Sequence, residues 1–278
     1  MPCSAPRCRS HRSSAGPQRS CSTRSSTAAS MAGEATSRCK ASHGNGQVST
    51  PWTTCTPSGG SRDLLHVNTL AAFDLEPATQ RGHVVHGAPV LTTERRAVPA
   101  ELPWATDDPT PIVLLSFSTV PEQRSPGMLQ RALDTLGQLP VHVAATTGGI
   151  VGPQDLNAPA NAHLIAFAGR EALMQRASLT VGHGGHGTTM RALRQGLPIA
   201  GIPASGSDQA LILQLLQQWY AGRALPADAG VAQIRSAAED ILADHTYHDE
   251  ALRRSHAFHG LDGAQLAADS VQTLLPQP

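Results

Sequence analysis

Residues 179–190 read LTVGHGGHGTTM, in which an apolar run ends in a turn with two histidines and three glycines. Glycines at 184, 185 and 187 let the backbone approach a ligand closely and adopt positive φ angles. His183, Thr188 and Thr189 add hydrogen-bond donors, and a helix that starts here presents free N–H groups and the positive end of its dipole. These groups predict a cradle for an anion such as a diphosphate.

Two other interpretations of this turn stay open. A glycine-rich turn between a strand and a helix can serve tight packing alone. His183 and His186 stand three apart, which could place both on one metal ion, but no Asp or Glu lies in the turn, so we expect no metal. We expect His186 to contribute its backbone N–H, with its side chain along the surface. The turn is neither a Walker A loop nor a Gly-x-Gly-x-x-Gly turn.

The elements around the turn alternate between apolar strands and amphipathic helices. Strands are predicted at 112–117, 141–146, 163–168, 179–182 and 199–203. Helices are predicted from Ser125-Pro126, over 171–176 and 188–194, from near Asp208, and along the apolar stripes that run through Val231 to Ile241 and Ala267 to Leu274. This alternation predicts an α/β fold, a doubly wound parallel sheet, whose ligands bind beyond the carboxyl ends of the strands.

The first part of the chain has a different composition. Residues 1–62 are rich in Ser, Arg, Thr, Gly and Pro, with Glu34 as the single acid and all five cysteines by position 55. Ordering such a segment would bury little apolar surface, so we expect it to be disordered or a non-native low-complexity segment; organellar transit peptides share this composition. Short strands are predicted within 64–74 and 83–91, and the Pro-rich, acidic segment 99–111 is typical of a linker.

The net charge and the lengths of the apolar runs argue against two classes of partner, nucleic acids and membranes. Lys and Arg balance Asp and Glu at 21 each, so a bulk electrostatic attraction to nucleic acid is missing. No stretch approaches the roughly 20 apolar residues that span a bilayer. We therefore expect a cytoplasmic protein with no membrane span and no nucleic-acid partner.

At 181–209 the sequence VGHGGHGTTMRALRQGLPIAGIPASGSDQ resembles the C-terminal donor domain of GT-B glycosyltransferases. The similarity is to bacterial macrolide and antibiotic glycosyltransferases of the UDP-glycosyltransferase superfamily. LLSFST (114–119) resembles the first strand and loop of that domain, and AFAGREALMQRAS (166–178) the segment that meets the base. The resemblance implies a Rossmann-like nucleotide-sugar-binding domain over 112–278, joined through the 99–111 linker to a remnant of the acceptor domain over 63–98.

The resemblance also implies roles for individual residues. The diphosphate of the donor would be held by His183, Gly184, Gly185, His186, Gly187 and Thr188, with Ser118 and Thr119 nearby. Asp208 and Gln209 would bind the hydroxyls of the sugar, and Phe167 would stack on the base. Two of these residues have other interpretations, because Phe167 could be core and Asp208 could cap the following helix.

Several positions depart from the pattern of the family. Arg191 stands where many relatives have a Glu for the ribose hydroxyls, and Ala210 and Ile212 replace a Pro and an Asn. The family's catalytic base, a His near the start of the acceptor domain, is not found. His11 and His43 lie in the low-complexity segment, so the catalytic residues stay unknown.

The implied reaction is the transfer of a sugar from a UDP- or dTDP-sugar to a hydroxyl of a small hydrophobic natural product, as in antibiotic biosynthesis. The nucleotide sugar is a co-substrate, and no cofactor is expected. We expect this chain to bind donor but to transfer poorly alone. The alternative function is that of a non-catalytic helper that pairs with a full-length glycosyltransferase, and a homodimer is a further form of association. An epimerase would need paired carboxylates near the diphosphate, and an oxidoreductase an early Gly-rich turn.

Overall fold

The computed structural model describes residues 64–73, 84–91, 101–118, 126–149, 151–204 and 208–275. All of them belong to one compact unit, residues 62–278. The expectations for residues 1–62, for Thr119 and for Ser125 as a helix cap lie outside the described residues. The predicted domain boundaries stay predictions.

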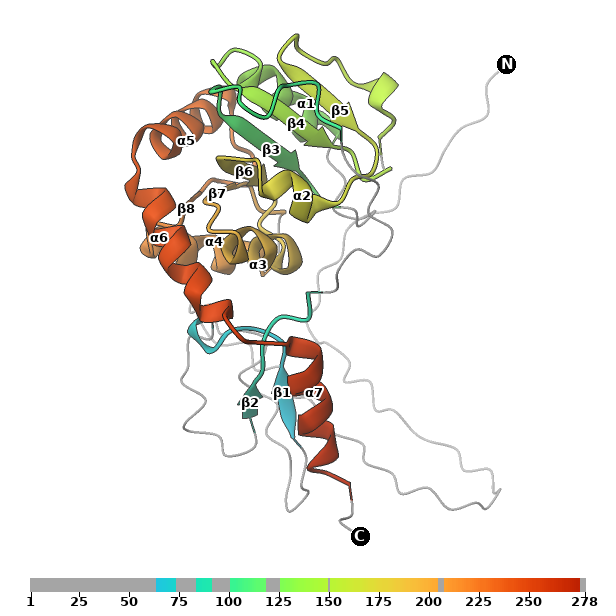
Figure 1. The fold of residues 1–278 in the computed structure, drawn as a ribbon. Coiled ribbons are helices and arrows are strands. Elements are labelled where there is room, and N and C mark those ends of the chain that lie inside the picture. The colour runs from blue at the N-terminus through green and yellow to red at the C-terminus, as the bar shows by residue number, and fades with distance from the viewer. Residues whose placement is uncertain are drawn as a thin grey trace, which may run out of the picture. The chain divides into compact units, whose positions relative to one another are not determined.

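Figure 1 shows a parallel sheet with helices on both faces. The strands are β1 (Leu65–Val67), β2 (Val84–His86), β3 (Ile112–Ser116), β4 (His142–Thr146), β5 (Ala162–Ile165), β6 (Leu179–Gly182), β7 (Ile199–Gly201) and β8 (Gly222–Ala224). The α-helices are α1 (Pro126–Leu136), α2 (Arg170–Met174), α3 (His186–Arg194), α4 (Gln209–Gln218), α5 (Val231–Ala243), α6 (Thr246–Ser255) and α7 (Gly263–Gln272). Short 3-10 helices are η1 (Ala71–Phe73), η4 (Pro153–Asp155) and η5 (His256–Phe258).

The larger sheet has the strand order β5-β4-β3-β6-β7-β8, and every pair in it is parallel. In the register, Val113 of β3 lies between Val143 of β4 and Leu179 of β6. The chain builds outward from β3 to β5 and then returns to continue on the other side with β6. This order confirms the doubly wound α/β fold, and it places the point of reversal between β3 and β6.

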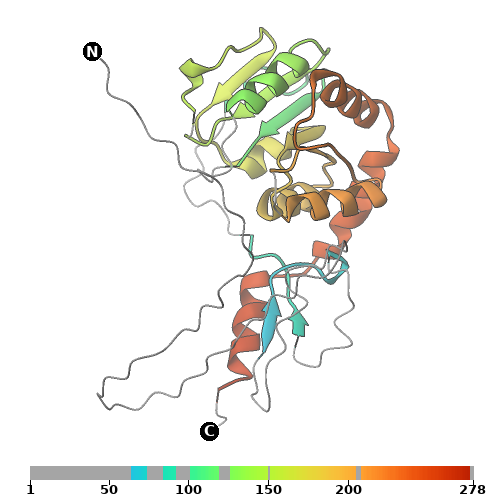
Figure 2. The same ribbon diagram turned by 180° about the vertical axis from the view of Figure 1, so that it is seen from behind.

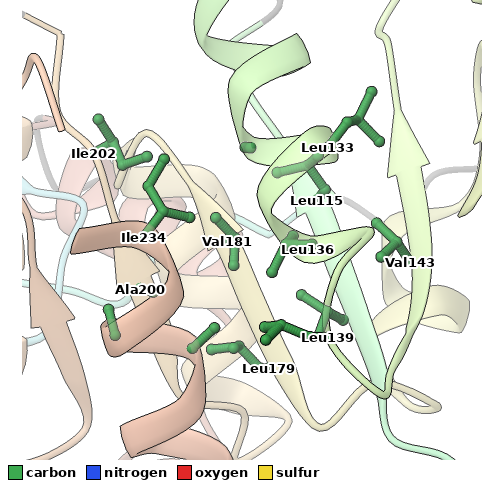
Figure 3. Packing of buried hydrophobic residues seen from close by; sticks show 14 of the residues in the cluster. Leu115, Leu133, Leu136, Leu139, Val143, Leu179, Val181, Ala200, Ile202 and Ile234 are labelled. Atoms are coloured by element: carbon green, nitrogen blue, oxygen red, sulfur yellow. The ribbon is translucent and has the colours of Figure 1, made fainter. Parts of the chain in front are cut away.

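Successive side chains of the buried strands point to opposite faces of the sheet and belong to two separate hydrophobic cores. Val113 and Leu115 pack with α1 and α5 on one face, where Leu133, Leu136 and Ile234 are almost inaccessible (Figure 3). Ile112 and Leu114 point to the opposite face, toward α2, α3, α4 and α6. Because both faces are covered, β3 is buried at every residue, as the apolar run at 112–117 predicted.

The predicted helix starts and stops are largely confirmed. Pro126 is the first residue of α1, where its missing N–H costs no hydrogen bond. Gly196 ends α3 with a φ of 68°, a left-handed conformation that glycine adopts without a Cβ penalty. The start of α3 differs from the prediction, since the helix begins at His186 rather than Thr188. Glycine at 187 has a low helix propensity, and this obscured the first turn in the sequence.

Other differences concern short or polar elements. The strand predicted over 163–168 ends at Ile165, and neither β8 nor α6 was predicted. β8 has only three residues, and α6 carries many charged side chains, so neither gives a clear apolar period. The apolar stripe expected on α7 does not face a core, because Val271 is 58% exposed and Leu274 is exposed as well.

β1 and β2 form a small parallel pair of strands, against which the C-terminal helix α7 lies (Figures 1 and 2). Nδ1 of His66 lies 2.9 Å from Oγ of Ser270 on α7. Phe73 of η1 meets the ring of Trp219 edge to face, with the ring centroids 4.7 Å apart. The chain end therefore returns to a segment about 200 positions earlier, which the local sequence pattern does not reveal.

The segment predicted as a linker is attached to the sheet where it is described. Trp104 stacks on His142 with ring centroids 4.4 Å apart, and Nε2 of His142 lies 2.9 Å from a carboxylate oxygen of Asp108. The guanidinium of Arg176 donates to the Trp104 carbonyl at 3.1 Å. These contacts hold 104–108 against the start of β4.

Among the helices of the described ranges, none combines the length and the apolar character needed to cross a membrane.

Candidate functional site

A cleft of about 290 Å³ lies at the carboxyl ends of β3, β6 and β7, where the strand order reverses. Open parallel sheets bind their ligands at this place. The cleft is lined by Phe117, Ser118, Arg170, His183, Gly185, His186, Gly187, Thr188, Asp208 and Gln209. Eight of these ten had been predicted as site residues, so the structure brings together side chains from three separate loops.

The turn before α3 has a shape that depends on its glycines. Gly184 has a φ of 73°, and a Cβ there would lie 2.6 Å from Cγ of Leu213, so a larger residue would be both strained and crowded. A Cβ on Gly185 would collide with Nε2 of His183. Gly184 is thus a packing residue beneath the site, whereas the bare backbone of Gly185 lets the imidazole fold over the turn.

The start of α3 presents its backbone N–H groups to the cleft. Gly185 is the N-cap residue and has no side chain to satisfy them; the first bond of the helix runs from the N–H of Thr189 to the carbonyl of Gly185, at 3.0 Å. The N–H groups of His186, Gly187 and Thr188 precede it and have no partner within the helix. Together with the helix dipole, they favour an anion in the cleft.

The environment of His183 favours a neutral imidazole. Burial lowers its pKa from the usual 6.5, and the positive charge of Arg170 acts in the same direction. The Ser116 carbonyl and the Asp208 carboxylate oppose this shift but do not reverse it. At neutral pH His183 therefore offers a single N–H donor rather than a full positive charge.

His186 does not lie along the surface as predicted. Its ring is half-buried, and Nε2 lies 3.0 Å from the hydroxyl oxygen of Thr69 in the segment after β1. Sequence reasoning could not find this partner because 117 positions separate the two residues. The two histidines of the turn thus have different surroundings, one over the cleft and one bonded to a distant segment.

Asp208 and Gln209 lie at the start of α4, and both line the cleft. Asp208 occupies the N-cap position, but its side chain makes no capping hydrogen bond, so the alternative of a simple helix cap does not describe it. Gln209 is 3% exposed, and its Oε1 accepts the N–H of Ala204 at 2.8 Å. The Gln209 side chain thus holds the backbone of Ala204 in place, in addition to lining the cleft.

Phe167 is 66% exposed, which excludes the alternative that it belongs to the core. It lies in the turn after β5, and its ring covers Gly149, where a Cβ would lie 2.6 Å from the ring edge. It does not line the cleft. Arg191, at the position of the expected ribose-binding Glu, donates to the carbonyl of Gly187 at 3.2 Å along α3.

Within the described ranges, His, Cys, Asp and Glu side chains do not gather in any group of three or more that could hold a metal ion. The cleft offers backbone N–H groups, an imidazole, a hydroxyl from Thr188 and a guanidinium from Arg170. These are donors suited to phosphate oxygens.

Comparison with known proteins identifies the domain that carries this cleft. Residues 130–258 match the family described as Erythromycin biosynthesis protein CIII-like, C-terminal domain. The CIII-like domain holds the turn at 183–189, both residues of the Asp208-Gln209 pair, and Arg170.

The relatives of the chain are glycosyltransferases. The chain is 25% identical to demethyllactenocin mycarosyltransferase of Streptomyces fradiae over 170 residues. The aligned part covers 61% of this chain and 37% of that enzyme. The structure of a calicheamicin glycosyltransferase superposes with a TM-score of 0.64 at 21% identity, over 76% of this chain and 51% of the other. The structure of a spinosyn rhamnosyltransferase in complex with thymidine diphosphate superposes with a TM-score of 0.62 at 20% identity. The superposition covers 79% of this chain and 57% of the other.

These likenesses show the fold of a GT-B donor domain, as the sequence predicted. The chain spans about a third of the length of the mycarosyltransferase and about half the length of the two solved structures. Sequence reasoning missed two lining residues, Arg170 within the CIII-like domain and Phe117, which precedes that domain. Phe117 is the last residue of the strand predicted over 112–117, and Arg170 follows the strand predicted over 163–168. A position at the carboxyl end of a strand was the signal that could have found them.

Proposed function

We propose that this chain binds a nucleoside diphosphate sugar in the cleft and acts as the donor-binding part of a glycosyltransferase. One observation carries the proposal: the free N–H groups at the start of α3 line the same cleft as His183 and Thr188, at the reversal point of the sheet. The match of residues 130–258 to the CIII-like family supports the reaction class.

In this proposal the hydroxyl of the acceptor attacks the anomeric carbon of the sugar, the bond from that carbon to the diphosphate oxygen breaks, and a base takes the hydroxyl proton. Attack from the opposite face inverts the anomeric centre. Negative charge grows on the departing diphosphate, where oriented N–H groups and the neutral His183 donor stabilise it in the transition state. No cofactor beyond the donor is proposed, and the base is not assigned.

The donor is proposed to be a UDP- or dTDP-sugar and the acceptor a hydroxyl of a hydrophobic small molecule. The spinosyn rhamnosyltransferase with a similar fold was solved in complex with thymidine diphosphate, which favours this class of donor. Asp208 faces the cleft without capping α4, so its carboxylate is suited to accept hydrogen bonds from sugar hydroxyls.

Titration calorimetry of the full chain with UDP and with dTDP tests the proposal. We expect saturable binding of at least one nucleotide, weakened by His183→Ala. His248→Ala is a matched control, since His248 is an exposed residue of α6 away from the cleft. Absence of binding for both nucleotides would overturn the proposed function.

A second candidate function is association with another protein, a full-length glycosyltransferase or a second copy of this chain. Leu65, Val85 and Val271, on β1, β2 and α7, expose large apolar side chains. Light scattering over a range of concentrations tests self-association. A monomer at every concentration would exclude the homodimer.

A further inference from the structure

Arg170 has no role in the function proposed above, although it lines the cleft with His183 and Thr188. It is the first residue of α2, the short helix that follows β5, so its backbone sits at the same edge of the sheet as the turn before α3. The resemblance of segment 166–178 gave Arg170 no role of its own, and its position after the strand predicted over 163–168 was the signal that could have found it.

The charges along the cleft are unevenly distributed. Among the described residues that line it, Arg170 is the one permanent cation and Asp208 the one carboxylate. Arg170 enters from the β5 side, and Asp208 enters from the β7 side at the start of α4. The α3 turn lies between them, so the cleft has a positive end and a negative end.

His183 is neutral at neutral pH, so it does not neutralise the charge of an anion in the cleft and leaves that task to Arg170. Burial and the charge of Arg170 both lower the His183 pKa, so the imidazole contributes a hydrogen bond but little formal charge at neutral pH. Arg191 donates to the Gly187 carbonyl and does not line the cleft. A dianionic ligand at the α3 turn would therefore rely on the Arg170 guanidinium for charge neutralisation.

We propose that Arg170 is the charge-bearing ligand of the donor diphosphate and so determines the preference of the cleft for diphosphate-containing ligands. The inference rests on the proposed function and adds a residue to its site. The planar guanidinium presents paired N–H donors that match two phosphate oxygens, a geometry that the lysine ammonium lacks. With Arg170 on the diphosphate and Asp208 on the sugar, the donor enters the cleft in one orientation.

The test compares wild type, Arg170→Gln, Arg170→Lys and the control Arg194→Gln. Arg194 is an exposed residue of the last turn of α3, so its loss changes the net charge equally without touching the cleft. Titration calorimetry measures UDP and dTDP, and NMR titration measures uridine and thymidine, which lack the diphosphate. The melting temperature of each variant reports whether the fold is intact.

We expect Arg170→Gln to weaken UDP or dTDP binding by about ten- to a hundredfold, the usual worth of a hydrogen bond to a charged group. Nucleoside binding should change by less than about twofold, because the affected contacts are electrostatic and local to the diphosphate. Arg170→Lys should retain part of the affinity, and Arg194→Gln should bind as wild type.

Wild-type affinity for the nucleotide in Arg170→Gln would overturn the inference and leave the proposed function standing. An equal loss for nucleotide and nucleoside would also overturn it, because Arg170 would then act on the fold or on the base. Lack of nucleotide binding by the wild type is a different result, which removes the proposed function and this inference with it. If Arg170→Gln does not fold, Arg170→Lys decides in the same way, with unchanged nucleotide affinity counting against the inference.

Discussion

Nε2 of His186 lies 3.0 Å from Oγ1 of Thr69, so the first residue of α3 is bonded to the segment that follows β1. The backbone and the side chain of His186 therefore make separate contributions. Its backbone N–H belongs to the helix start that lines the cleft, and its side chain connects that start to residues 64–73. The pair couples the candidate site to a segment that is distant in the sequence.

The first prediction concerns this pair. Thr69→Ala and His186→Ala should each lower the free energy of unfolding by about 1 kcal/mol, the net worth of a neutral hydrogen bond. In urea unfolding the double variant should lose less than the sum of the two single losses, because both remove the same bond. Strict additivity would show that the contact contributes nothing.

The second prediction separates the two histidines by ligand binding. His183→Ala removes a donor over the cleft and should weaken binding of UDP or dTDP by about tenfold. His186→Ala keeps the backbone N–H and should weaken binding much less. Calorimetric titrations of both variants provide the comparison. Equal losses would revive the interpretation of the two histidines as a metal pair.

The third prediction concerns the contact between Asp108 and His142 at the start of β4. The hydrogen bond from His142 lowers the Asp108 pKa from 3.8 to about 2, with a further contribution from the N–H of Thr110. The unfolded chain binds this proton more tightly, so the stabilising contribution is present above pH 3.8 and is lost as the pH falls toward 2. Asp108→Asn should remove this part of the acid dependence in urea unfolding, and Asp134→Asn, at an exposed position of α1, is the control.

The fourth prediction compares two glycines of different surroundings. A Cβ on Gly182 would collide with the Ser116 carbonyl oxygen across the β3–β6 pair, so Gly182→Ala should cost about 1–3 kcal/mol of stability or more. A Cβ on Gly127 meets no atom within 4 Å, and Gly127→Ala should stabilise α1 by about 0.4–1 kcal/mol. Thermal unfolding measures both; a neutral Gly182→Ala would mean that the two strands can separate without cost.

Much of the fold could be predicted because its elements carry local patterns. The run IVLLSF at 112–117, apolar except for Ser116, predicted a strand that is buried on both faces, and β3 is buried at every residue. The apolar spacing of Leu129, Ala132, Leu133 and Leu136 predicted α1, and all four are buried. β8 and α6 were missed because a three-residue strand and a highly charged helix carry little periodic signal.

The candidate site divides in the same way. The sequence alone determined the glycine-rich turn at 183–189 and its position after a strand, since local chemistry and strand order specify both. Only the tertiary structure decided that Arg170 enters the cleft, that Gln209 holds the backbone of Ala204, and that His186 turns to Thr69. The contacts of Arg170 with the cleft and of His186 with Thr69 join segments whose distance in space depends on how the whole sheet is wound. The local sequence around a residue does not reveal which distant residues its side chain contacts in such a fold.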